Sequence, residues 1–302
     1  MTVRITQRAL ALNSLAGLNS NLAAVNKLQN QLTSGTTISK PSDDPTGTNT
    51  VMITRGAIAG NEQQARNISD GKTFINATDS ALQNMLDQVR QVRDLAVQAL
   101  NTGGSSTASN TAIATQVEGV RTSLIGAANQ VVQGRPIFGG VTTGSLAYDS
   151  TGTYVGVGGA NGVAVQPVNR RVSDVEAIRV DLTGPEAFGD PASGPDLFAV
   201  VGNVAAHVGD QAALTTDLSD LDAAIDRIST ALADIGTRAA RFDNADSVNS
   251  SQALTLQAKL SATQDVDLPK TIMELQMQQT GYQAALSVTA KSLQPTLLDF
   301  LK

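Results

Sequence analysis

Residues 15–32, LAGLNSNLAAVNKLQNQL, decide how this chain folds. Their apolar residues recur at intervals of three and four, the repeat of a helix that lays one face against another helix. We call this row the N-terminal stripe; its members are Leu15, Leu18, Leu22, Val25, Leu28 and Leu32. No neighbouring stretch of sequence offers an obvious partner for it.

The other end of the sequence repeats the pattern over residues 268–297. This C-terminal stripe, with spacings of three, four and seven, consists of Leu268, Ile272, Leu275, Tyr282, Leu286, Leu293 and Leu297. We expect the two terminal helices to pack on each other and then on further copies of the chain, so the two stripes are the predicted assembly interface. Periodicity alone leaves open that both ends dock only on helices of their own chain.

The composition favours a core of packed helices. Of the 302 residues, 41% are hydrophobic but only 3% are aromatic, and Trp is absent. Such a core must consist of Ala, Leu, Val and Ile, which suits long helices better than a β-sandwich. Because only 16% of the residues are charged, Asn, Gln, Ser, Thr and Gly must cover much of the surface.

Charge and cysteine content argue against several functions. A net charge of −6 argues against sequence-independent nucleic-acid binding, which needs a basic surface. Without cysteine there is no disulfide, thiolate metal site or cysteine nucleophile. The first residues lack the apolar segment of a signal peptide, and no apolar run reaches the roughly 18 residues of a membrane span. We therefore expect neither nucleic-acid binding nor membrane insertion.

Helices are predicted over both halves of the sequence. The first covers residues 5–33, and the second starts at Asp44-Pro45, where a carboxylate can cap the first amides and proline has no amide to leave unpaired. It runs to about residue 102, with a kink left open at Asp70-Gly71, because glycine inside a helix costs about 1 kcal/mol. A third helix over 109–132, with Val131 facing inward, would complete an antiparallel hairpin.

The composition then changes to Gly, Asp, Thr and Val between residues 140 and 195. Val163-Ala164-Val165 and the segment 177–182 are typical of short strands, which predicts a small β-rich insert. Helical periodicity returns at Asp196, continues as a seven-residue repeat to Phe242 and weakens towards residue 260. After a link at Asp265-Val266-Asp267, the last helix is expected to run to about residue 301.

The expected fold class is therefore mainly α with a β insert. An elongated coiled-coil or helical-bundle rod would be formed by the N- and C-terminal segments, with a central, small, mostly β domain. Residues 1–42 with 264–302 would form a terminal coiled-coil assembly domain. Residues 43–140 with 196–263 would form the helical rod, and residues 141–195 the solvent-exposed insert.

No group of residues indicates a catalytic, cofactor-binding or metal site. His207 is the only histidine, and we interpret it as a surface or cap residue. Paired carboxylates can do acid–base work, but those beside the apolar repeat of residues 218–242 fit a solvated helix face better; they are Asp217, Asp220, Asp222 and Asp226. The Gly-rich stretch 156–162 lacks the last glycine of GxGxxG and a lysine for phosphate, so it fits a turn.

A series of motifs, in order, resembles the flagellin superfamily over about residues 1–140 and 200–302. These motifs are LTSG at 32–35, KPSDDPTG at 40–47, QARNISDG at 64–71, QVRDLAVQA at 91–99, LSATQDVDL at 260–268 and QPTLLDFL at 294–301. GRPIFGG at 134–140 is more similar to the hook–filament junction branch of this superfamily than to flagellins. The Gly-rich insert resembles nothing closely.

The resemblance implies a structural protein of the bacterial flagellum rather than an enzyme. The terminal helices would form the inner coiled-coil layer of a tube, the long helices the layer outside it, and the insert would face solvent. The implied partners are further copies of the chain in a ring, the first hook–filament junction protein, flagellin and an export chaperone. Export would use the flagellar type III channel and place the protein outside the cell. A filament subunit, flagellin itself, is the alternative.

Overall fold

The computed structural model describes residues 7–101, 106–160 and 163–292. Helices dominate and the strands are short, which confirms the expected fold class. The elements are α1 (Gln7–Ser34), α2 (Pro45–Asn101), α3 (Thr107–Ala128), β1 (Val131–Val132), β2 (Arg135–Pro136), β3 (Asn169–Arg171), β4 (Ala177–Arg179), α4 (Gly184–Phe188), α5 (Leu197–Ala206), α6 (Gln211–Gln264) and α7 (Leu268–Ser292).

The chain divides into two compact units, each described here by itself. The terminal unit comprises residues 1–60 and 253–302, and the central unit comprises residues 61–252. The terminal unit therefore holds α1, α7, the start of α2 and the end of α6. Among the helices of the described residues, none is both long and apolar enough to cross a bilayer.

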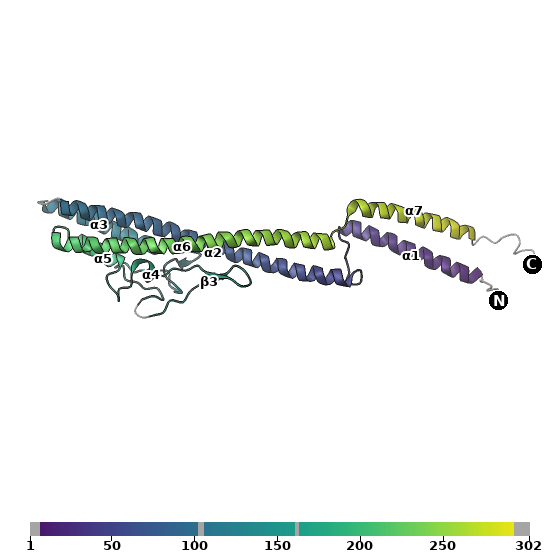
Figure 1. The fold of residues 1–302 in the computed structure, drawn as a ribbon, viewed down its shortest axis with the longest axis horizontal. Coiled ribbons are helices and arrows are strands. Elements are labelled where there is room, and N and C mark those ends of the chain that lie inside the picture. The colour runs from purple at the N-terminus through teal and green to yellow at the C-terminus, as the bar shows by residue number, and fades with distance from the viewer. Residues whose placement is uncertain (1–6, 102–105, 161–162, 293–302) are drawn as a thin grey trace, which may run out of the picture. The chain divides into compact units, whose positions relative to one another are not determined.

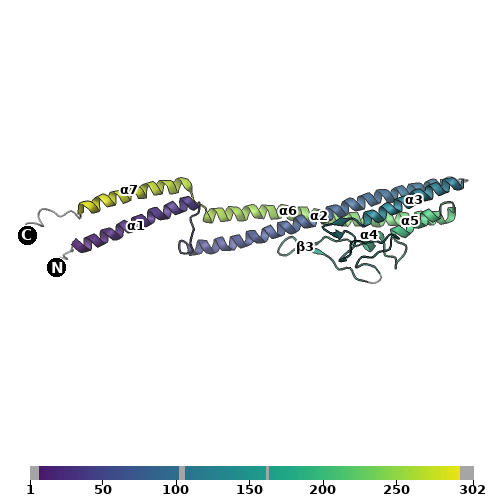
Figure 2. The ribbon, with the colours of Figure 1, turned by 180° about the vertical axis from the view of Figure 1, so that it is seen from behind.

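In the terminal unit, α1 and α7 lie side by side and antiparallel, as Figures 1 and 2 show from opposite sides. Helix α1 ends at Gly35, whose φ of 71° is the left-handed conformation that glycine adopts without strain at a helix C-terminus. Helix α2 begins as expected, since the amide of Gly47 donates to Asp44 Oδ1 at 2.9 Å and Pro45 is the first helical residue.

Backbone hydrogen bonds tie the end of α1 to the end of α6 within this unit. The amide and the hydroxyl of Thr37 both donate to the carbonyl oxygen of Gln264, at 2.7 and 2.9 Å. The amide of Val266 donates to the carbonyl oxygen of Gly35 at 3.1 Å. The start of the link between α1 and α2, residues 35–44, is therefore held against the end of α6.

In the central unit, α2 and α6 run antiparallel. Their charged residues pair in opposite order along the two helices: Lys72 Nζ lies 2.9 Å from Asp243, and Arg93 Nε lies 2.6 Å from Asp222. The apolar face predicted for α2 is buried in the core, including Ile75, Leu82, Val89, Val92 and Ala96. The repeat predicted for α6 supplies the facing side with Leu221, Ile228, Ile235 and Phe242.

A buried polar pair joins the same two helices. The side-chain amide of Asn61 on α2 donates to the carbonyl oxygen of Asn249 on α6 at 3.2 Å. Asn249 returns the bond to the carbonyl oxygen of Asn61 at 3.1 Å. Because both side chains are buried, a shift of one helix along the other would leave these groups without partners.

Helix α2 continues without a break through Asp70-Gly71, where the sequence left a kink open. A Cβ at Gly71 would overlap the aromatic ring of Phe242, which is fully buried. The glycine therefore makes room for a core ring of α6. Burying that ring offsets the modest helix penalty of glycine, which is about 1 kcal/mol.

The prediction of helix to residue 132, with Val131 facing inward, is wrong. Helix α3 ends at Ala128, and Val131 is 47% exposed in β1. The cause is a two-residue hairpin turn: Gln133 and Gly134 both have positive φ, 52° and 78°, which is the geometry of a type I′ turn. Few residues other than glycine adopt this conformation, so Gln133 was not recognisable as a turn residue from the sequence.

The insert is less regular than predicted. The strand predicted at 163–165 is wrong, because residues 163–168 are not in a strand; β3 at 169–171 pairs instead with β4, which confirms only the first half of the strand expected at 177–182. Side-chain packing compensates for the short strands. Aromatic rings from the insert, from Phe138 just before it and from α5 pack together: Phe138 and Phe188 meet edge to face with centroids 4.9 Å apart, and Tyr148 and Phe198 are tilted with centroids 4.6 Å apart.

Helix α4 was not predicted. Thr183 and Glu186 form a capping box, in which the Thr183 amide and hydroxyl both donate to Glu186 Oε2 at 2.9 Å. Arg179 on β4 donates to the same carboxylate and also to Asp181 Oδ2 at 2.9 Å. This charged network anchors the only short helix of the insert among the described residues to strand β4.

Candidate assembly surface

The N-terminal stripe is only partly covered by the chain's own residues. Val25 is buried, and Leu18, Leu28 and Leu32 are half-buried. Leu15 and Leu22 remain 53% and 41% exposed. The packing of α1 on α7 therefore covers one edge of the stripe and leaves the other edge open.

The C-terminal stripe shows the same division on α7. Leu275 and Tyr282 are half-buried, whereas Leu268, Ile272 and Leu286 are 50%, 45% and 42% exposed. Leu293 and Leu297 lie outside the described residues. Three of the five described members of the C-terminal stripe are therefore exposed.

Additional exposed apolar side chains lie on α1 and α7 outside the predicted stripes. Met273, Met277 and Val288 on α7 are 62%, 70% and 67% exposed, and Leu12 on α1 is 59% exposed. They do not belong to the leucine repeats, and at 100° per residue Met277 and Val288 fall on the face of α7 opposite the C-terminal stripe. The spacing of four between the two methionines is the signal that could have found them.

Few polar contacts hold α1 to α7. Gln278 Nε2 on α7 donates to Asn21 Oδ1 on α1 at 3.2 Å, and Asp267 caps α7 by accepting from the amide of Lys270 at 3.1 Å. The pair is thus aligned by one side-chain bond among the described residues and by a narrow apolar seam. Its outer surface is free to meet other helices.

The two units also differ in charge. The terminal unit contains 9 basic and 6 acidic residues, whereas the central unit contains 12 basic and 21 acidic residues. The net charge of −6 therefore comes from the central unit alone. A chain with oppositely charged units can attract further copies of itself.

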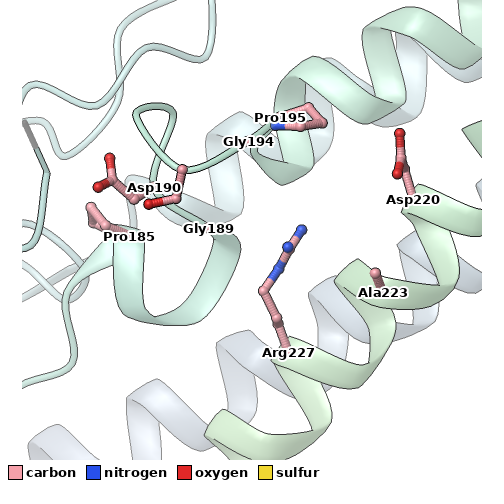
Figure 3. Close-up of a pocket in the computed structure, with 9 residues that line it drawn as sticks. Pro185, Gly189, Asp190, Gly194, Pro195, Asp220, Ala223 and Arg227 are labelled. Carbon is pink, nitrogen blue, oxygen red and sulfur yellow. The ribbon is translucent and has the colours of Figure 1, made fainter.

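A surface hollow of about 380 Å³ in the central unit is the place where small-molecule chemistry could be sought. Figure 3 shows Arg227 rising from α6 toward a loop that carries Asp190 and Gly194. Asp220 and Ala223 line the hollow from the same helix as Arg227 (Figure 3). One cation faces two carboxylates in an open, shallow space, an arrangement without a nucleophile or a base oriented by a second group.

His207 has a structural place at the C-terminal end of α5. Its Nδ1 lies 2.7 Å from Asp217 Oδ2, and the carboxylate of Asp217 is buried. The prediction of a solvated face is therefore wrong for Asp217, because its partner arrives from α5. Asp222 is exposed as predicted and pairs with Arg93. Within the described part of the chain, no group of three His, Asp or Glu residues could hold a metal ion.

Two family models match the ends of this chain. The bacterial flagellin N-terminal helical region matches residues 5–143, and the bacterial flagellin C-terminal helical region matches residues 218–301. The chain belongs to the flagellin family. The matched regions contain both terminal helices and both long helices, and they leave out most of the insert.

Two relatives within the flagellin family match nearly the whole chain. Flagellar hook-associated protein 3 of Salmonella typhimurium is 26% identical, with 94% of this chain and 95% of that protein covered. Flagellin of Bacillus subtilis is 29% identical, with 97% of each covered. Sequence similarity alone therefore places the chain near both branches of the family.

Solved structures of family members share the fold. FlgL of Bacillus cereus superposes with a TM-score of 0.58 at 24% identity, covering 68% of this chain and 97% of that one. A putative flagellar hook-associated protein of Vibrio parahaemolyticus superposes with a TM-score of 0.65 at 19% identity, covering 74% and 100%. At these identities the likeness extends to the fold alone.

Proposed function

We propose that this chain is a structural junction protein of the bacterial flagellum, which forms a ring between the first hook–filament junction protein and the flagellin filament. The observation that carries the proposal is the uncovered apolar surface of the two stripes, where Leu15, Leu22 and Leu268 remain 53%, 41% and 50% exposed. A helix pair with such a surface is completed by other helices. The similarity to a hook-associated protein supports the place in the flagellum.

The two stripes form the assembly interface in this proposal. The less exposed members of each stripe pack between α1 and α7, and the exposed members contact neighbouring copies. The role is therefore geometric rather than catalytic: one end of the ring fits the first junction protein and the other fits flagellin.

Export through the flagellar type III channel, with a dedicated chaperone, is part of the same proposal. Passage through a channel requires the chain to unfold, and the terminal unit buries little apolar surface to resist this. A chaperone that covered the exposed leucines would also prevent early assembly. The protein would then act outside the cell.

The alternative function is that of the filament subunit. The 29% identity to Bacillus subtilis flagellin over 97% of the chain favours it. A filament subunit would use the same stripes but would add copies without limit. The two functions therefore predict assemblies of different size, a ring or a filament, built from the same contacts between copies.

Deletion of the gene in the bacterium that carries it separates these functions. For a junction protein, cells without the chain keep making flagellin but release it into the medium, and their hooks carry no filament. For a filament subunit, the hooks also lack filaments, but no flagellin accumulates in the medium. Electron microscopy of the hooks and protein analysis of the medium distinguish the two results.

A further inference from the structure

A second hollow, of about 350 Å³, lies wholly within the terminal unit, where the link 35–44 passes the first turns of α2. Two cations, Lys40 and Arg55, contribute to its lining, and its lining includes no carboxylate. Ile38 and Met52 add apolar surface, and Met52 is 68% exposed. The hollow therefore combines positive charge with an apolar wall.

The carboxylates nearest in sequence are committed to the backbone. Asp43 Oδ2 accepts from the amides of Ser39 and Lys40, at 3.3 and 3.0 Å. Asp44 accepts from the amide of Gly47 at the start of α2. These bonds fix the shape of the link, and within the described part of the chain no carboxylate pairs with the ammonium group of Lys40.

The hollow also contains hydrogen-bond donors in excess. Thr48 Oγ1 is buried and has no partner among the described residues. Arg55 Nη2 donates to Gln264 Oε1 at 3.0 Å, which orients the guanidinium group and leaves its other N–H groups available. A buried hydroxyl without a partner destabilises the fold, so a ligand that accepted its hydrogen bond would bind more tightly for doing so. A carboxylate is the group that fits donors of this kind.

Charge identifies the source of that carboxylate as a second copy of the chain. The terminal unit has an excess of basic residues, and the central unit has 21 acidic residues against 12 basic ones. Glu62 on α2 and Asp226 on α6 are exposed, and neither forms an ion pair with another described residue. Such carboxylates are available for contacts between copies.

We propose that the Lys40–Arg55 hollow receives an acidic side chain from the central unit of a neighbouring copy. This inference rests on the proposed function, because it needs a self-assembled ring. The carboxylate accepts from Arg55, Lys40 and the hydroxyl of Thr48, and its aliphatic stem lies against Met52. Different surfaces of the two copies meet in this contact, which is the kind of interface that closes into a ring when its rotation allows.

The first test replaces Met52 with the photoreactive residue p-benzoylphenylalanine in the full-length chain, assembled on flagella of its own bacterium. Irradiation is expected to give a product of about twice 31.2 kDa, in which the label is joined to a peptide from residues 61–252. The same label at Val175, which is 97% exposed in the central unit, is the control and should not react with the link 35–44.

Other products would overturn the inference. A cross-link to flagellin or to the first junction protein would show a different occupant, and a cross-link confined to one chain would show none. The absence of any product would mean that the hollow stays open to solvent. In each case, filaments still attached to the hooks would leave the proposed function intact, whereas hooks without the chain would refute that function itself.

The second test reverses one charge of the hollow. Arg55→Glu is expected to lower the number of hooks that keep a filament by about tenfold, the effect of losing roughly 1.4 kcal/mol at the contact. Arg55→Lys keeps the charge and should retain most of the function. Lys259→Glu is the matched control, because Lys259 is an exposed base of the same unit that does not line the hollow.

An equal loss from Arg55→Glu and Lys259→Glu would show that only the net charge of the terminal unit matters, and would overturn the inference. Thermal melting of the purified variants separates assembly from folding, since both positions are exposed and neither change should move the central unit's melting temperature.

Discussion

The terminal and central units are both mainly helical, but they differ in how much apolar surface they bury. Among the described residues of the terminal unit, only two apolar side chains are buried, Val25 and Val51, against 37 in the central unit. The central unit has a closed core of long helices and an aromatic cluster. The terminal unit has an apolar seam with its outer half open. The comparison shows that a similar helical periodicity can belong to a core that is fully buried within the chain or to an apolar face that stays partly exposed.

The largest expected effect comes from the core of the central unit. Phe242→Ala would remove a fully buried ring and leave a cavity beside Gly71, so we expect a loss of about 3–5 kcal/mol in the free energy of unfolding. Denaturant unfolding followed by circular dichroism measures it. Val248→Ala, on the same helix but 58% exposed, is the control and should change stability by less than about 0.5 kcal/mol. Equal losses would contradict a closed core.

The polar pair of the central unit should have the next largest effect. Asn249→Ala removes the side-chain amide that donates to the carbonyl oxygen of Asn61, whereas Asn61 keeps its own bond to the backbone carbonyl of residue 249. Losing this one buried hydrogen bond costs roughly 0.5–1.5 kcal/mol. Asn84→Ala, an exposed asparagine of α2, serves as the control. The same denaturant unfolding measures both variants. If Asn249→Ala were neutral, water rather than packing would satisfy the pair, and the core would be less closed than described.

A smaller effect is expected at acid pH in the insert. Burial raises the pKa of the Glu186 carboxyl, but hydrogen bonds from Arg179 and Thr183 outweigh burial and hold this pKa below its usual value. A lowered pKa in the folded state means that stability is present above the unfolded value, near 4.5, and is lost as the pH falls below it. Burial raises the pKa of Asp196, which opposes the loss.

Unfolding between pH 3 and 6 checks the direction of this effect. Glu186→Gln should flatten the decline on the acid side, because the substituted amide does not titrate. Asp79→Asn changes a carboxylate outside the Arg179 network and should leave the decline in place. A decline that persisted in Glu186→Gln would assign it to other carboxyl groups.

The smallest effect on stability, and the sharpest contrast, is expected in the terminal unit. Leu22→Ala should change the unfolding free energy of the dilute chain by less than about 1 kcal/mol, because the side chain is 41% exposed. The same change should sharply reduce attachment of filaments to hooks. Hydrogen exchange of the dilute chain is a second measurement: amides of α1 and α7 should exchange faster than those of α2 around Leu82. Equal protection would mean that the terminal unit is complete by itself.

Regular periodicity made the long helices of both units predictable from the sequence. The start of α2 at Asp44-Pro45 was also predictable, because capping is a local effect. The hairpin at Gln133-Gly134 and the loop at 163–168 depend on positive φ values and on side-chain bonds to distant residues, which local patterns do not carry. For the same reason Asp217 could not be recognised as buried, since its partner His207 belongs to another helix.

The candidate assembly surface was predicted in part. The stripes identified which residues belong to the contact between the two helices, but not which members of each stripe are covered by the chain's own residues. That division depends on how α1 meets α7. The Lys40–Arg55 hollow was not predictable, because its lining brings together the link, α2 and the end of α6.

The reciprocal amides of Asn61 and Asn249 have a consequence for assembly of the proposed ring. Leucine-rich seams tolerate slippage by a whole heptad, and a slipped molecule would still look well packed. The amide pair permits one alignment, so every molecule that folds presents its acidic side chains at the same intervals along α2 and α6. Because every copy then has the same spacing between its contact residues, a closed ring can form without an angular error that accumulates from copy to copy.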